Sequence, residues 1–150
     1  MHWLIFKGYH KMTQNCKVQS SLQGTISPFV GNLSLLCMLN LSWNSLTQRI
    51  PTDFGNLKVL RRLDLSSNLH FEGPFLKSLC NCTHLQWIDF SFNDLTGTSP
   101  PEIGGLFKLE HLELSYNRLC GSIPTSLSNC TSLLQFHIDG NINLNGLIPS

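Results

Sequence analysis

Charged side chains are scarce in this sequence. Asp, Glu, Lys and Arg make up 13% of its 150 residues, whereas they make up about a quarter of an average soluble domain. The formal net charge is +1, so no electrostatic field favours nucleic acid or an anionic membrane as a partner. The polar surface must therefore come mostly from serine, threonine, asparagine and glutamine.

Long apolar runs are also missing. No segment approaches the roughly 20 apolar residues that a transmembrane helix needs. The apolar stretch near the amino terminus, Trp3 to Phe6, is shorter than the roughly 7–15 residues of a secretory signal core. We therefore expect neither a membrane span nor a signal peptide in this chain.

Leucine, in contrast, is abundant, with 27 residues that recur at a fixed period. The pattern L-x-x-L-x-L-x-x-N occurs five times, with its asparagines 24, 25, 24 and 24 residues apart at Asn44, Asn68, Asn93, Asn117 and Asn141. Isoleucine or phenylalanine replaces leucine at Ile88, Phe90, Phe136 and Ile138. Five matches in register indicate a repeat protein.

The two leucines of L-x-L lie on one side of an extended strand, and the residue between them lies on the other. Stacked repeats bury these leucines in one continuous column. The asparagine ends each strand, and its amide can satisfy backbone groups in the turn and in the next repeat. We predict an α/β solenoid of about five repeats of 24–25 residues, with a curved parallel sheet on its concave face.

The second half of each repeat resembles G-x-I-P-x-x-L-x-N-L, most clearly from Gly121 onward. Proline suits the first turn of a helix, so we predict short helical or 3-10 segments on the convex face. The first half-copy begins at Leu22. We assign residues 1–21 to a non-repeat segment, partly disordered or a degenerate cap, and residues 22–150 to a repeat domain truncated at its carboxyl end.

Two repeats carry an extra residue after the strand-ending asparagine. Four positions usually separate this asparagine from the glycine slot, but five separate Asn68 from Gly73 and Asn141 from Gly146. We predict a one-residue bulge in the turn. Phe71 and Leu144 should still point inward, and the strand register should be unchanged.

The variable strand positions should project together onto the concave face, where they face solvent. Aromatic residues and arginine commonly anchor interfaces, and acidic positions beside them suit a peptide or protein ligand with a basic or apolar side chain. An alternative is that the aromatic rings merely cover neighbouring strands. The predicted ligand-binding residues are Trp43, Arg62, Asp64, Trp87, Asp89, Phe92, His111, Glu113, Tyr116 and His137.

Asp89, Glu113 and His137 should be neighbours on successive strands, about 4.8 Å apart. They could form a pH-sensitive contact or, with His111 and Asp139, a weak metal site; we favour a solvated polar column. No activated nucleophile or water-excluding pocket is indicated. We therefore expect no enzymatic activity, no cofactor and no bound metal.

Six cysteines raise the question of disulfides. Cys82 and Cys130 share one repeat slot and should point into the core, but two repeats separate them by about 10 Å. A disulfide needs Cα atoms within roughly 7 Å, so we predict that they do not pair. The remaining spacings favour unpaired thiols and supply no zinc site.

Four N-x-S/T sequons could carry glycans if the chain enters the secretory pathway. Three of them share one slot on the helical side, whereas the fourth lies on the strand face, where a glycan would obstruct binding. The three are Asn32, Asn81 and Asn129, and the fourth is Asn40.

Over residues 22–150 this arrangement resembles the plant-type leucine-rich repeat. That type is found in ectodomains of plant receptor-like kinases and receptor-like proteins, and in polygalacturonase-inhibiting proteins. Family members usually carry an amino-terminal cap with a cysteine pair; here that region offers Cys16. The kinase glycine-rich and catalytic-loop motifs are absent. The resemblance implies an extracellular or plasma-membrane location.

The leading hypothesis is a non-enzymatic recognition module that binds a peptide, a carbohydrate or a co-receptor protein on its concave face. A second is an inhibitor of a secreted cell-wall hydrolase, similar to polygalacturonase-inhibiting proteins. A third is an enzyme built around His111, Glu113 and His137. A fourth is a truncated fragment without an independent function.

Overall fold

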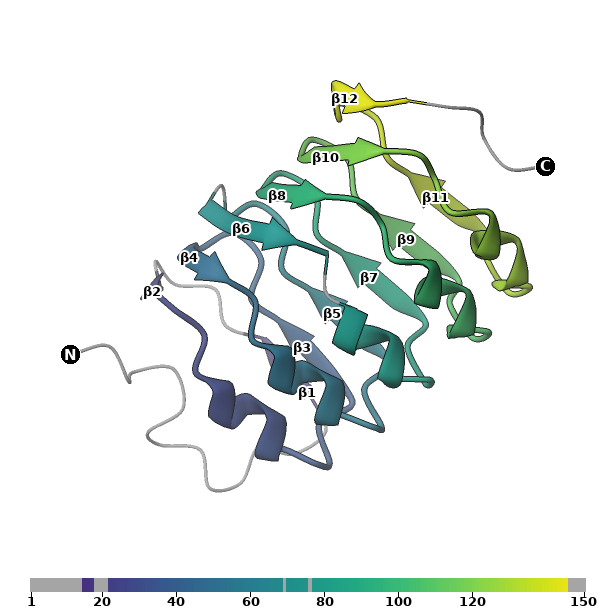
Figure 1. Ribbon diagram of the computed structural model, residues 1–150. Coiled ribbons are helices and arrows are strands. Elements are labelled where there is room, and N and C mark those ends of the chain that lie inside the picture. Colours follow the sequence, from purple (N-terminus) through teal and green to yellow (C-terminus); the bar gives the residue numbers. More distant parts are fainter. Residues whose placement is uncertain (1–14, 18–21, 69, 76, 146–150) are drawn as a thin grey trace.

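The computed structural model describes residues 15–17, 22–68, 70–75 and 77–145. In this part of the chain the repeats stack as a staircase that rises from β2 to β12 (Figure 1). The first parallel sheet contains, in spatial order, β1 (Asn15–Lys17), β3 (Met38–Asn40), β5 (Arg62–Asp64), β7 (Trp87–Asp89), β9 (His111–Glu113) and β11 (Gln135–His137).

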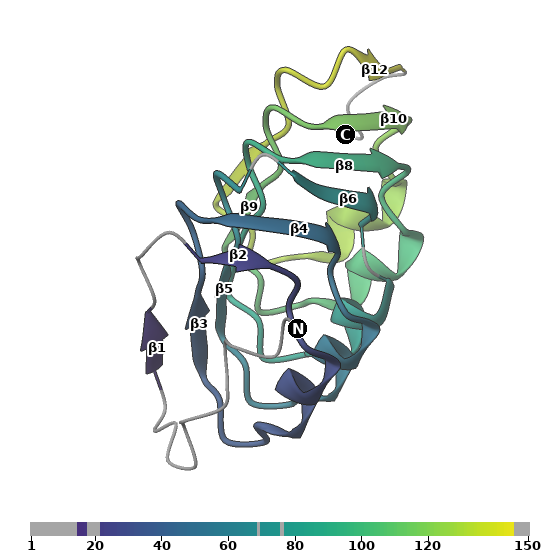
Figure 2. The ribbon, with the colours of Figure 1, turned by 90° about the vertical axis from the view of Figure 1, so that its left-hand side faces the viewer.

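A second parallel sheet and a row of 3-10 helices complete each repeat. The second sheet contains β2 (Gln23–Gly24), β4 (Ser45–Arg49), β6 (His70–Pro74), β8 (Asp94–Gly97), β10 (Arg118–Gly121) and β12 (Asn143–Leu144). The helices are η1 (Pro28–Asn32), η2 (Thr52–Asn56), η3 (Lys77–Asn81), η4 (Pro101–Gly105) and η5 (Thr125–Asn129). Figure 2 shows the second-sheet strands running from the first sheet toward the helices.

The predicted concave sheet and 3-10 segments are therefore present. The second sheet was not predicted, because its strands lack the L-x-L pair that marks the first sheet and carry at most one inward apolar residue each. The expected place of proline is wrong by one position in three repeats: Pro51, Pro100 and Pro124 are N-cap residues that precede the helices η2, η4 and η5. Strand β1 lies within residues 1–21 and pairs with β3.

The repeated apolar slots form one core between the two sheets and the helices. The paired L-x-L side chains of the central strands are buried, and so is Phe54 of η2. Cys82 and Cys130 are buried free thiols, as predicted, and their Sγ atoms donate to the carbonyls of Phe54 and Ile103. The side chain of Cys16 lies outside the described residues.

The strand-ending asparagines form a buried ladder through the stack. Asn68 shows the pattern: its Nδ2 donates to the Leu65 carbonyl of its own turn at 2.9 Å and to the Leu41 carbonyl of the preceding repeat at 3.1 Å. Its Oδ1 accepts from the Leu46 N–H at 3.1 Å. The cross-repeat bonds therefore run to the preceding repeat, not to the next one as the sequence suggested.

The extra residue after Asn68 leaves the first sheet in register. Phe71 is buried, and Leu144 packs against the core from a half-buried position, so both point inward as predicted. In the first sheet, Asp64 still pairs with Asp89. The insertion has a local cost: among the described residues no donor reaches Oδ1 of Asn93, the next asparagine of the ladder.

The glycine slot at the end of the second-sheet strands requires a left-handed backbone. Gly73, Gly97 and Gly121 have φ of 88°, 76° and 74° there, and Gln48 occupies the same slot with φ of 66°. Side chains with a Cβ disfavour this region by about 1–2 kcal/mol. Gln48 is therefore a strained position in the second repeat.

A second glycine slot allows the 3-10 helices to pack closely. A Cβ added at Gly104 would lie 2.4 Å from the Ser126 carbonyl oxygen of the next repeat, whereas a Cβ at the neighbouring Gly105 would meet no atom within 4 Å. Adjacent glycines of one helix therefore have opposite roles, one at a repeat contact and one in open space.

We predict that Gly104→Ala lowers the free energy of unfolding by about 1–3 kcal/mol, because the helices η4 and η5 must separate to admit the methyl group. The matched variant Gly105→Ala should be neutral or stabilising by up to about 1 kcal/mol, since it restricts the unfolded chain. Urea denaturation followed by circular dichroism measures both. Equal effects of the two substitutions would contradict this packing.

We predict that Gln48→Gly raises the free energy of unfolding by about 0.5–1 kcal/mol, because it removes left-handed strain at the cost of added unfolded-chain entropy. Gly97→Gln is the reverse test, since its Cβ would make only an ordinary 3.5 Å contact with Pro74. It should destabilise by a similar amount. Thermal melts of both variants test the prediction, and an unchanged melting temperature for Gln48→Gly would refute it.

Candidate functional site

The first sheet brings the predicted ligand-binding residues into three columns on its exposed face. Strand pairing aligns two of the columns residue by residue, and backbone hydrogen bonds just after the strands align the third. Each column takes one residue from each of five repeats. The mixed column is Met38, Arg62, Trp87, His111 and Gln135; the acidic column is Asn40, Asp64, Asp89, Glu113 and His137; and the ring column is Trp43, Ser67, Phe92, Tyr116 and Gly140.

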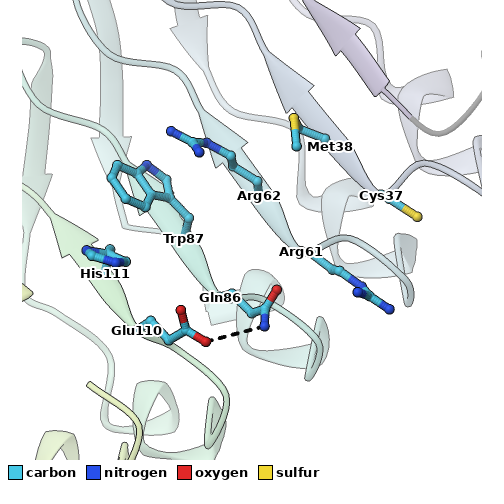
Figure 3. A pocket seen from close by; sticks show the side chains of 8 residues that line it. All are labelled: Cys37, Met38, Arg61, Arg62, Gln86, Trp87, Glu110 and His111. Atoms are coloured by element: carbon cyan, nitrogen blue, oxygen red, sulfur yellow. Dashed lines mark hydrogen bonds between the residues drawn. The ribbon is translucent and has the colours of Figure 1, made fainter. Parts of the chain in front are cut away.

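Side chains of the mixed column stack on one another across the strands. The Arg62 guanidinium lies 4.1 Å from the centre of the Trp87 ring, and the Trp87 and His111 ring centres are 4.3 Å apart. His111 Nδ1 lies 2.9 Å from Oε1 of Gln135. Figure 3 shows Trp87 between Arg62 and His111. Cation–π and ring contacts thus hold a continuous polar and aromatic surface in place.

A shallow cavity of about 500 Å³ lies over this part of the sheet (Figure 3). Arg61 and Arg62 contribute positive charge to it, and neither forms a salt bridge within the described part of the chain. The Trp87 indole N–H is buried and has no acceptor among the described residues. The cavity therefore offers hydrogen-bond donors beside an aromatic surface.

In the first four members of the acidic column, the side chain bonds to the serine two residues further along the chain. Asp89 Oδ1 accepts from the Ser91 N–H at 3.0 Å and the Ser91 hydroxyl at 2.7 Å. Asn40 makes the same pair of bonds to Ser42. Asp64 is 9% exposed and does not face solvent freely, which corrects the expectation for this residue.

Burial raises the pKa of Asp89, and hydrogen bonds from Ser91 partly oppose this rise. The charges of Asp64 and Glu113 on the neighbouring strands raise the pKa of Asp89 further, but they are smaller causes than burial. Repulsion between like charges, which the sequence suggested, therefore contributes to the raised pKa of Asp89 but is a smaller cause than burial. Burial therefore makes the charged form of Asp89 less favourable than that of an exposed aspartate.

Glu113 and His137 are in contact, as their register predicted. Nδ1 of His137 lies 2.7 Å from Oε2 of Glu113, while Oε1 of Glu113 accepts from the Ser115 hydroxyl. The same hydroxyl lies 2.8 Å from Oδ1 of Asp139. No cluster of three or more potential metal ligands occurs in the described residues, and the geometry matches a polar hydrogen-bonded column.

The ring column has an unusual backbone. Trp43, Ser67, Phe92 and Tyr116 all have φ between 54° and 57°, and Gly140 has φ of 71°. Left-handed geometry in the turn after each strand directs these side chains away from the sheet. The rings of Phe92 and Tyr116 stack with centres 4.5 Å apart and an angle of 11° between planes. Trp43 is 72% exposed.

Sequence reasoning missed the row that borders the mixed column. Cys37, Arg61, Gln86 and Glu110 precede the strands β3, β5, β7 and β9, and all four line the cavity. Gln86 Nε2 lies 3.4 Å from Oε1 of Glu110 (Figure 3). The repeat register contained this signal, since these residues share one slot directly before the variable strand positions.

Among the described residues no helix is both long and apolar enough for a membrane span. The sequence profile of the Leucine Rich Repeat family matches residues 35–57, 84–106 and 108–130. The chain is 37% identical to receptor-like protein 41 of Arabidopsis thaliana over 133 residues, which cover 87% of this chain and 15% of that protein. It therefore spans a small part of the length of that relative.

Two solved structures share the fold closely. The structure of the plant peptide hormone receptor RGFR1 in complex with RGF2 matches with a TM-score of 0.81 and 35% identity, covering 87% of this chain and 21% of that one. The ectodomain of the receptor kinase SOBIR1 from Arabidopsis thaliana matches with a TM-score of 0.80 and 34% identity, covering 91% of this chain and 72% of that one. The chain therefore belongs to the leucine-rich repeat family and resembles part of the ectodomain of plant receptor-like proteins and receptor kinases.

Proposed function

We propose that this chain is a non-enzymatic recognition module that binds a peptide or protein ligand on the face of its first sheet. The observation that carries the proposal is the exposure of stacked rings in register on that face. Phe92 and Tyr116 are 45% and 52% exposed although they contact each other. Covering neighbouring strands would bury such rings more fully, whereas a ligand would cover the exposed area.

The polar groups of the same face complement a peptide. Arg61 and Arg62 supply donors at the cavity, and Asp89 supplies a carboxylate on the same sheet. A peptide main chain and its side chains offer both acceptors and donors to such a face. The similarity to RGFR1, solved in complex with RGF2, supports the choice of a peptide.

The sequons are compatible with this use of the sheet, and we propose an extracellular location for the chain. Asn32, Asn81 and Asn129 are exposed last residues of η1, η3 and η5, so glycans on them would leave the first sheet open. The amide of Asn40 is engaged on both sides: Nδ2 donates to Asp64 and Oδ1 accepts from Ser42. Asn40 is therefore the least suitable glycan acceptor.

We predict that a variant with Trp87→Ala, Phe92→Ala and Tyr116→Ala together loses at least about tenfold of its affinity for a captured ligand, because truncated interface rings each cost about 1–2 kcal/mol or more. The measurement is a pull-down from secreted plant proteins and peptides, quantified by mass spectrometry against wild type. Phe107→Ala, at a 60% exposed ring in the turn after η4, is the matched control. Unchanged capture by the triple variant would remove the proposal.

We predict that Asp89→Asn increases stability at neutral pH and weakens binding of a basic ligand. The bonds of Asn40 to Ser42 show that asparagine fits this hydrogen-bond pattern. Because the folded-state pKa of Asp89 is raised, its stabilising contribution is present at low pH and is lost as the pH rises through that pKa. The gain in urea stability should therefore vanish in acid, where Asp89 is protonated. A gain of equal size at both pH values would contradict the assignment.

A further inference from the structure

The ring column is interrupted at one position between two rings. Trp43 follows strand β3, Ser67 follows β5 and Phe92 follows β7, and these three strands are successive neighbours in the first sheet. The next pair, Phe92 and Tyr116, is not interrupted. A serine thus stands where the column would otherwise continue with a third ring between Trp43 and Phe92.

The backbone at Ser67 is equivalent to that of its neighbours in the column. The Trp43 N–H donates to the Ser66 carbonyl at 3.0 Å, and the Ser67 N–H donates to the Ser91 carbonyl at 2.9 Å. The φ of Ser67 is 55°, against 57° at Trp43 and 54° at Phe92. All three residues therefore leave the sheet in the same way, from adjacent strands.

Strand spacing leaves room for one aromatic ring between Trp43 and Phe92. Adjacent parallel strands are about 4.8 Å apart, so two steps separate Trp43 from Phe92 by about 10 Å at the backbone. The stacked rings of Phe92 and Tyr116 span one such step with a centre distance of 4.5 Å. One ring placed between Trp43 and Phe92 would repeat this spacing on each side. The Ser67 hydroxyl makes no hydrogen bond within the described residues.

We propose that the gap above Ser67 binds one planar aromatic side chain of the peptide ligand, which stacks between Trp43 and Phe92. This inference rests on the proposed function and names one residue class that the ligand must contain. Offset stacking of aromatic rings adds to the energy of apolar burial. A saturated ring of the same size would gain the energy of burial but not the energy of aromatic stacking, so the gap should prefer a flat ring.

The first test compares two capped pentapeptides, Gly-Lys-Phe-Lys-Gly and the same peptide with cyclohexylalanine in place of phenylalanine. Binding is followed by NMR chemical-shift titration of the wild type, with the Trp43 indole N–H as the reporter. We expect the phenylalanine peptide to bind about tenfold more tightly, since it stacks on two faces. No preference for the flat ring would overturn the proposal.

The second test fills the gap from within. Ser67→Tyr is compatible with the backbone, because Tyr116 has the same left-handed conformation in the same column. It should abolish the preference for the phenylalanine peptide, and Ser67→Ala, which leaves the gap open, should retain it. Trp43→Ala removes one wall without filling the gap and should reduce the preference to about threefold. An undiminished preference in Ser67→Tyr would refute the site.

The introduced ring also reports on the gap without any ligand. In Ser67→Tyr, nuclear Overhauser contacts should join the new ring to both Trp43 and Phe92; their absence would show that the gap is not ring-sized. Applied to a captured ligand, the variants separate the two proposals. Binding lost in the Trp87, Phe92 and Tyr116 triple variant but kept in Ser67→Tyr would overturn the ring site and leave the proposed function standing. Binding kept in both would overturn both.

Discussion

The buried asparagine amide is the interaction on which this structure depends. From Asn68 onward, each amide holds its own turn closed and donates to a carbonyl of the preceding repeat, as Asn117 does to Leu114 at 3.1 Å and to Phe90 at 2.9 Å. A buried polar group is costly unless it is paired. The asparagine bonds can form at only one relative position of two neighbouring repeats, so other positions are disfavoured. Leucine burial supplies the driving force, but leucine columns alone are tolerant of small shifts.

The ladder explains why an extra residue is tolerated in the turn and not in the strand. The insertion after Asn68 lies downstream of the amide that fixes its repeat, so strands β5 and β7 remain paired residue by residue. Its effect appears at the acceptor side of the next amide: Asn93 Oδ1 has no donor within the described part of the chain, whereas the bonds that Asn93 Nδ2 donates to Leu65, Phe90 and Ser91 are kept. The extra residue therefore leaves the strand pairing intact, and its visible cost is one missing hydrogen bond.

Period and register in the sequence were sufficient to predict the first sheet, the inward slots and the alignment of the three surface columns. They were insufficient to predict features that depend on the direction of a side chain or on how deeply it is buried. Asp64 occupies a surface column and is nevertheless buried, because Asn40 and Ser66 bond to its carboxylate. The stacking of Arg62 on Trp87 depends on side-chain rotamers, which the sequence pattern does not specify. The second-sheet strands contain a left-handed residue that is glycine in most repeats. In the repeat with Gln48 the same backbone conformation occurs without a glycine to mark it in the sequence.

The two left-handed columns of the solenoid show how the same backbone requirement is met differently on two surfaces. On the second sheet the slot holds glycine in Gly73, Gly97 and Gly121, which accept positive φ without strain. On the first sheet the equivalent geometry is held by bulky rings such as Phe92 and Tyr116, for which it is unfavourable by about 1–2 kcal/mol each. Stability alone would place glycine in both columns. Strained residues that persist on one exposed face support the proposed recognition role, and left-handed geometry directs those rings away from the sheet, where the proposed ligand would meet them. Strain and exposure therefore occur together in the ring column, and both support the proposed role in recognition.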